Sequence, residues 1–160
     1  MGSRNFAAIA KEQFSFLIDE YSCKLIECLE KDWGYNLVYK NKTTYIKIMY
    51  EYREAYILIT LYRLVDGKYI ENPRNIEDDT VLYGYVLDDI ISIKDSSALV
   101  KPAYQYGDDS EYYDEEKGLF LYCQKFADNL RKFGSDVLSG DFSIFAETDK
   151  IVKERARKYR

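Results

Sequence analysis

Hydrophobic residues near the N-terminus recur every three or four positions, which predicts an amphipathic helix over residues 6–21. Its apolar face is formed by Phe6, Ile9, Ala10, Phe14, Leu17, Ile18 and Tyr21. Ser3 is its predicted N-cap, because a serine hydroxyl can accept a hydrogen bond from a free N–H of the first turn. The first element of the fold is therefore expected to be a helix.

After this helix the pattern changes to the alternation that is typical of strands. We expect strands at residues 23–30, 35–40, 43–51 and 55–65. In the third of them one face is shared by Thr44, Ile46, Ile48 and Tyr50. The other face carries mainly polar side chains, so the alternation predicts an antiparallel sheet with one face in solvent.

Helical spacing returns in the second half of the chain. Residues 66–83 and 95–109 are expected to be loops, with a short helix at 85–94 between them. A long apolar stripe predicts a helix over residues 110–138, and a last helix is expected from Phe142 onwards. The order predicts a single α+β domain over residues 1–160: an antiparallel four-stranded sheet with N-terminal and C-terminal helices packed on one face.

Composition and length predict a globular protein of one domain. The chain has 160 residues, of which 47% are hydrophobic and 32% charged. No stretch resembles a secretory signal or reaches the ~20 apolar residues of a membrane helix. Cys23, Cys28 and Cys123 lack metal-site spacing and are interpreted as buried, reduced thiols. We expect a cytoplasmic protein that does not bind membranes.

The chain contains no histidine, which removes the usual general base and the commonest metal ligand. Hydrolases with a histidine base are therefore excluded, and no glycine-rich phosphate loop is present, so we predict no cofactor. Carboxylate chemistry is left open. Asp78-Asp79 and Asp88-Asp89 could hold Mg²⁺ or Ca²⁺, which would make the chain a carboxylate-dependent, metal-assisted enzyme.

Charge is distributed unevenly along a chain whose net charge is −5. Residues 150–160 hold six basic residues and one acid, which we interpret as compensation of a helix dipole. The excess of acids elsewhere would repel phosphates, so nucleic acid is not an expected partner. Residues 66–116 hold 14 acids and four bases.

Tyrosines are concentrated with these acids, since residues 102–116 contain four tyrosines and six acids. Tyrosine is enriched at binding hot spots, and surrounding acids would steer a basic protein partner. The predicted partner-binding residues are Tyr104, Tyr106, Asp108, Asp109, Glu111, Tyr112 and Tyr113, together with Glu77, Asp78 and Asp79 of the preceding loop. Two alternatives stay open: a solvated surface with tyrosines covering the core, and a self-interface of a homo-oligomer.

Four short motifs are spread over most of the chain. They are Phe14-Ser15-Phe16-Leu17 before Tyr21, Val38-Tyr39-Lys40-Asn41, Tyr50-Glu51-Tyr52-Arg53, and Gly140-Asp141-Phe142-Ser143-Ile144-Phe145. Together they resemble a small, uncharacterised bacterial family, to which no catalytic residues are assigned. Size, acidity and the α+β domain also resemble those of immunity proteins, the inhibitors of bacterial toxins. The sequence thus predicts a non-enzymatic, immunity-type binding protein whose basic partner is a toxin.

Overall fold

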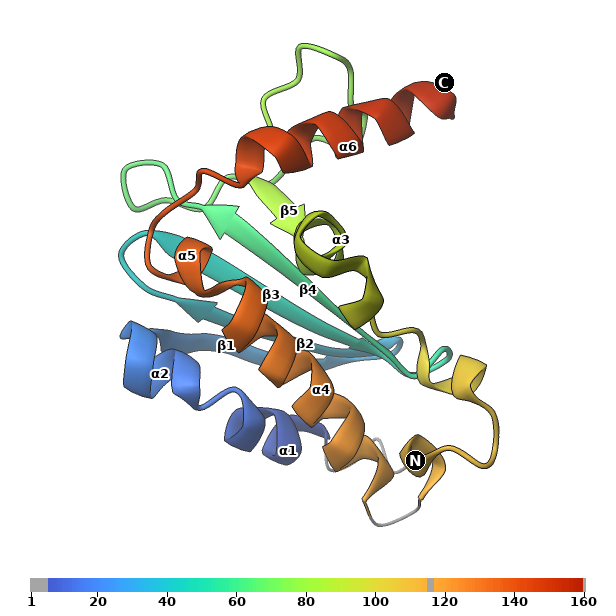
Figure 1. The fold of residues 1–160 in the computed structure, drawn as a ribbon. Coiled ribbons are helices and arrows are strands. Elements are labelled where there is room, and N and C mark those ends of the chain that lie inside the picture. Colours follow the sequence, from blue (N-terminus) through green and yellow to red (C-terminus); the bar gives the residue numbers. More distant parts are fainter. Residues whose placement is uncertain (1–5, 115–116, 160) are drawn as a thin grey trace.

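A computed structural model describes residues 6–114 and 117–159, in which helices pack against an antiparallel sheet (Figure 1). The strands described are β1 (Lys24–Lys31), β2 (Gly34–Lys40), β3 (Thr44–Glu51), β4 (Tyr56–Arg63) and β5 (Gly84–Val86). Each strand pairs with the next, so the order in the sheet is the order in the chain. The α+β class and the antiparallel sheet are confirmed, but the described sheet has five strands rather than the predicted four.

The additional strand, β5, lies where we expected a loop to run into a helix. Tyr85 pairs with Leu61 and Gly84 pairs with Tyr62 of β4. Glycine is required at position 84 because a Cβ there would lie 2.2 Å from the Tyr62 ring. Three residues are too few to show an alternation, so hydrophobic patterning could not distinguish β5 from the surrounding loop.

Six α-helices and three short 3₁₀ helices are described alongside the sheet. The α-helices are α1 (Phe6–Gln13), α2 (Phe16–Tyr21), α3 (Leu87–Asp95), α4 (Gly118–Phe133), α5 (Ser135–Leu138) and α6 (Phe145–Lys158). The 3₁₀ helices are η2 (Ser96–Ala98), η3 (Ala103–Tyr106) and η4 (Glu111–Tyr113). The predicted N-cap Ser3 lies outside the described residues.

Two of the predicted helices are divided. The helix expected over residues 6–21 is broken between α1 and α2, where Phe14 and Phe16 are both buried on either side of the exposed Ser15. The helix expected over 110–138 becomes η4, α4 and α5. The apolar spacing continues across both breaks, so the pattern predicts the helix ends wrongly. It predicts most of the buried face, but Ile18 of the predicted apolar face is 47% exposed.

The core lies between the sheet and the layer formed by α1, α2, α3, α4 and α5, which Figure 1 shows on one side of the strands. The predicted alternation in β3 is confirmed, because Thr44, Ile46, Ile48 and Tyr50 are all buried. Phe6 of α1 stacks on Tyr50, with ring centroids 4.5 Å apart. No helix in the described part of the chain has the length and apolar character needed to cross a membrane.

The opposite face of the sheet carries the alternate residues of each strand. One row across this face consists of Leu29, Asn36, Met49 and Leu58. Further along, Tyr69 from the loop after β4 stacks on Tyr45 at 4.0 Å and meets Tyr62 edge-on at 4.9 Å. This loop therefore covers the end of the face near β5, while the row at Met49 stays partly exposed.

The three cysteines do not share one environment. Cys23 and Cys123 are buried, and burial raises the pKa of both thiols, to about 11 and about 12. The expectation that all three are buried is wrong for Cys28, which is exposed on the edge strand β1.

Candidate partner-binding surface

The predicted tyrosine-rich segment folds into η3 and η4 at the end of the sheet where β3 turns into β4. The Ala103 N–H donates a hydrogen bond of 3.2 Å to the carbonyl of Ala55 in that turn. Lys101 is held twice, because its N–H donates to the Tyr106 hydroxyl at 2.9 Å and its carbonyl accepts from the Tyr122 hydroxyl at 2.7 Å. The segment is therefore attached both to the sheet and to α4.

Aromatic rings connect this segment to the core. Tyr106, Tyr112, Tyr122 and Phe126 follow one another edge-on, each pair of centroids 5.1 Å apart. Tyr112 is only 6% exposed, so it supports the surface from beneath and offers little area to a partner. Edge-to-face contacts of this kind stabilise a packed arrangement, which fixes the exposed ring of Tyr106 on a rigid base.

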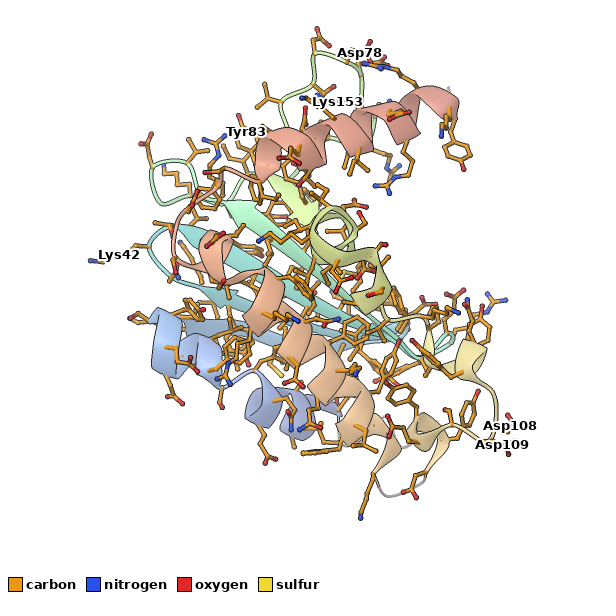
Figure 2. All side chains as sticks on the ribbon, in the orientation of Figure 1. Lys42, Asp78, Tyr83, Asp108, Asp109 and Lys153 are labelled. Carbon is orange, nitrogen blue, oxygen red and sulfur yellow. The ribbon has the colours of Figure 1, made fainter. Side chains whose placement is uncertain are left out.

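Three of the predicted tyrosines remain accessible: Tyr104 is 52% exposed, and Tyr106 and Tyr113 are each 38% exposed. Asp108, Asp109 and Glu111 are also exposed, and Figure 2 shows Asp108 and Asp109 at the outer end of the molecule. No side-chain hydrogen bond or ion pair joins these three carboxylates to another described residue. We refer to Tyr104, Tyr106, Asp108, Asp109, Glu111 and Tyr113 as the acid–tyrosine surface.

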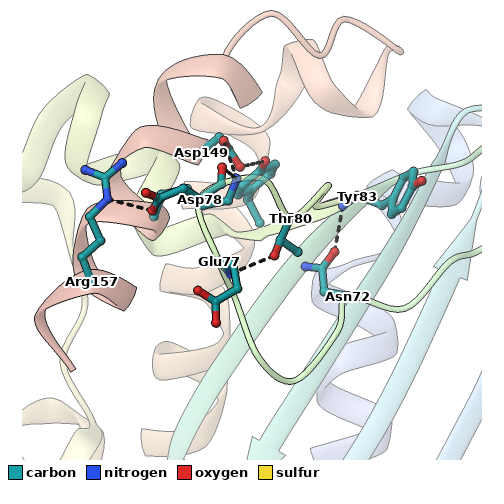
Figure 3. A network of polar contacts seen from close by, with 9 residues as sticks. Asn72, Glu77, Asp78, Thr80, Tyr83, Asp149 and Arg157 are labelled. Atoms are coloured by element: carbon teal, nitrogen blue, oxygen red, sulfur yellow. Dashed lines mark hydrogen bonds and ion pairs between the residues drawn. The ribbon is translucent and has the colours of Figure 1, made fainter. Parts of the chain in front are cut away.

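The second predicted group, Glu77 to Asp79, lies at the opposite end of the molecule from Asp108 and Asp109, as the position of Asp78 in Figure 2 shows. All three residues are exposed, and Figure 3 shows Asp78 directed towards Arg157 of α6. The Asp78 carboxylate accepts a 2.8 Å hydrogen bond from Nε of Arg157, and the Glu77 N–H donates to Oγ1 of Thr80 at 2.8 Å. The structure does not bring the two predicted groups together.

A second acid of the acidic region, Asp89, also binds the basic helix α6, and Asp149 binds a lysine within the same helix. Arg155 donates to both carboxylate oxygens of Asp89, at 3.0 and 2.8 Å. Lys153 is buried, and its Nζ lies 3.2 Å from Oδ2 of Asp149 and 3.2 Å from the carbonyl of Asp78. Asp149 additionally accepts a 2.6 Å hydrogen bond from the Tyr85 hydroxyl. Much of the basic charge of α6 is thus neutralised within the chain.

The sequence interpretation missed these contacts because the partners are far apart in the chain. Tyr85 and Asp149, Asp89 and Arg155, and Asp78 and Arg157 are separated by 64 to 79 positions. A signal was nevertheless present, since an acidic region and a basic helix of opposite excess charge can bind each other. Each of the exposed pairs contributes about 0–1 kcal/mol.

Asp88 and Asp89, one of the two carboxylate pairs considered for a metal-assisted enzyme, bind two different partners. Asp88 accepts a hydrogen bond from the Tyr56 hydroxyl, whereas Asp89 binds Arg155. Among the described residues, no three Asp, Glu or Cys side chains gather into a group that could hold a metal ion. In this arrangement the two adjacent carboxylates do not converge on one point.

Asp88 leads to a prediction about pH. Burial is the largest cause that raises the pKa of this carboxyl, Asp89 adds to it, and the hydrogen bond from Tyr56 opposes it. The folded protein therefore binds the Asp88 proton more tightly than the unfolded chain does. As the pH falls from 7 through the pKa in the folded protein, wild type should gain stability relative to Asp88→Asn.

Urea denaturation of wild type and Asp88→Asn at pH 7 and pH 4 measures this difference. Wild type should become the relatively more stable of the two at the lower pH. A difference that is the same at both values would contradict the raised pKa.

A groove that the sequence did not indicate lies at the same end of the sheet, on the face opposite the helices. It has a volume of about 270 Å³ and is lined by Trp33, Met49, Glu51, Tyr56 and Leu58. The signal in the sequence was weak, because these residues belong to three separate segments. Met49 is nevertheless apolar at a position where the alternation of β3 predicts a solvated face, and Leu58 lies opposite it on β4.

No family model, curated protein or solved structure matches this chain.

Proposed function

We propose that the chain is a non-enzymatic, acidic binding protein that caps a basic protein partner with the acid–tyrosine surface. The observation that carries this proposal is the combination of three exposed tyrosines on a fixed base with three exposed carboxylates that have no ion pair among the described residues. Tyrosine offers a large contact area at a low entropic cost. The carboxylates would steer a basic surface towards it.

The contrast between the two acidic groups supports this assignment. Asp78 and Asp89 are bound to arginines of α6, so their charge is largely compensated within the chain. Asp108 and Asp109 are not bound in this way and lie at the other end. A basic partner is therefore attracted most strongly to the end that carries the tyrosines.

Preorganisation also supports a binding role. The backbone of residues 101–106 is tied to Ala55, and Tyr106 rests on Tyr112, so the surface needs little ordering when a partner binds. Ordering costs reduce affinity, and a fixed surface avoids part of them. The resemblance to immunity proteins favours a basic toxin as the partner. The chain would inhibit this toxin by covering part of the toxin's surface.

Replacing both Tyr104 and Tyr113 with serine should weaken binding of the partner at least tenfold, because truncation of a hot-spot tyrosine typically costs more than about 1 kcal/mol. The measurement is affinity capture from the lysate of the native host at low salt, followed by elution with high salt and quantitative mass spectrometry. A basic protein that wild type retains should be lost from the double variant.

Tyr159→Ser is the matched control, since Tyr159 is 85% exposed but lies just beyond the C-terminal end of α6. This variant should capture the same protein as wild type. Equal capture by the double variant would refute the proposal, and so would retention that does not change with salt.

A further inference from the structure

The groove on the open face combines three kinds of side chain in a small volume. Met49 and Leu58, opposite each other on β3 and β4, contribute apolar surface, and the aromatic residue Trp33 and part of Tyr56 also line it. Glu51, opposite Tyr56, adds one carboxylate. No side-chain hydrogen bond or ion pair joins Glu51 to another residue that the structure describes.

This combination matches the chemistry of an arginine side chain. Its aliphatic stem can lie along apolar surface while the charged end reaches a polar group. A guanidinium group stacks on aromatic faces and binds a carboxylate through two hydrogen bonds, and it is more weakly hydrated than an ammonium group. Trp33 and Glu51 supply an aromatic side chain and the carboxylate.

The size of the groove favours a single side chain. Its volume of about 270 Å³ lies below the roughly 300–1,000 Å³ of pockets for drug-sized ligands. The edge of the groove at Tyr56 is anchored from the helix side, because the Tyr56 hydroxyl donates to Asp88 of α3 and its ring meets Phe126 of α4 edge-on at 5.9 Å.

The groove is also adjacent to the acid–tyrosine surface. The N–H of Tyr52 donates a 2.9 Å hydrogen bond to the carbonyl of Trp33, which joins the β1–β2 turn to the β3–β4 turn. The β3–β4 turn is joined in its own right to the tyrosine-rich segment through Ala55 and Ala103. One partner could thus contact both features around the same end of the sheet.

We infer that the groove binds an arginine side chain of the basic partner, with the aliphatic stem on Met49 and Leu58, the guanidinium against Trp33 and the charge on Glu51. This inference rests on the proposed function, because it names a residue type that the partner must present. It adds a specificity pocket to a surface whose other contacts are exposed tyrosines and acids.

The position of Trp33 allows a direct test, because it is the one tryptophan of the chain. Its selectively excited fluorescence is followed while the peptide acetyl-Gly-Arg-Gly-amide is added. The fluorescence should change saturably, with an affinity in the millimolar range. The peptide with citrulline, which keeps the shape of arginine without its charge, should bind at least about fivefold more weakly.

Peptides with leucine or lysine in place of arginine test whether the groove binds any apolar side chain or any cationic side chain. Both should bind more weakly than the arginine peptide. Citrulline or leucine binding as tightly as arginine would show an apolar pocket without charge recognition, and would overturn the inference. Equal binding of the lysine peptide would overturn the assignment to arginine, as would the absence of a saturable response.

Variants connect the response to the groove. Glu51→Gln should reduce the affinity for the arginine peptide about fivefold while leaving that for the citrulline peptide unchanged. Glu54→Gln is the matched control, because Glu54 is exposed in the turn that follows Glu51 and does not line the groove. Equal effects of both changes would contradict a role for Glu51. Thermal denaturation checks that both variants are folded.

Failure of this inference can be told apart from failure of the proposed function. If the arginine peptide does not bind but Tyr104→Ser with Tyr113→Ser still abolishes partner capture, the groove inference fails by itself. If the peptide binds and the tyrosine variant captures the partner normally, the acid–tyrosine surface is not the interface, and the groove remains a site for arginine.

Discussion

Replacing Gly34 with alanine is expected to lower the free energy of unfolding by about 3 kcal/mol or more. A Cβ at this position would lie 1.7 Å from the carbonyl oxygen of Tyr50 and 2.8 Å from its carbonyl carbon. Both atoms belong to the backbone of the neighbouring strand, which is held in a ladder on its other side as well. Relief of the clash therefore requires β2 and β3 to separate at this end.

Urea denaturation followed by circular dichroism measures the loss. Gly67→Ala is the control, since Gly67 has a φ of +75° but no atom within 4 Å of the added Cβ. Only backbone strain acts there, so this change should cost about 1 kcal/mol. Equal costs at the two positions would show that the close approach at Gly34 is relieved by a small movement.

Replacing Asp149 with alanine is expected to cost about 3 kcal/mol at neutral pH. The change leaves the buried ammonium of Lys153 with the carbonyl of Asp78 and without its carboxylate. It also removes the acceptor of the Tyr85 hydroxyl, whose pKa is raised by burial and by the hydrogen bond to Asp149. Removing one partner of a buried ion pair costs more stability than the intact pair contributes, because the remaining charge is left buried without a counter-charge.

A second substitution separates this effect from a general disturbance of α6. Lys153→Met keeps the length and most of the volume of the side chain without its charge, so the double variant Asp149→Ala/Lys153→Met should be more stable than Asp149→Ala. Lys150→Met, at an exposed position of the same helix, should change stability by less than about 0.5 kcal/mol. Failure of Lys153→Met to restore stability would indicate that the two residues are not coupled.

The local elements of the fold could be predicted from the sequence because they depend on neighbouring residues. The four longer strands lie within two residues of their predicted bounds, since the alternation in β3, the apolar run of β4 and the turns between strands are local signals. The break at Ser15 could not be predicted, because the apolar spacing of Phe14 and Leu17 continues through it. Helix ends depend on tertiary packing that a hydrophobic period does not record.

The candidate site was predictable only in part. Exposure of Tyr104 and Tyr113 agrees with the hydrophilic segment around them, whereas the burial of Tyr112 depends on a 3₁₀ turn that places it against Tyr122. The attachment of Asp78 to Arg157 depends on how the long loop after β4 returns to α6. The groove depends on strand register, which places Glu51 opposite Tyr56.

The sequential strand order has a consequence for synthesis of the chain. Each strand of the sheet can pair as soon as its successor leaves the ribosome, but the covering helix α4 ends at Phe133, well after β4 ends at Arg63. At a synthesis rate of roughly 5–20 residues per second, α4 is completed about 4–14 seconds after β4. During this time the apolar sheet face that includes Ile48 and Ile59 is not yet covered by α4. A nascent chain therefore passes through an interval in which chaperones could bind this face.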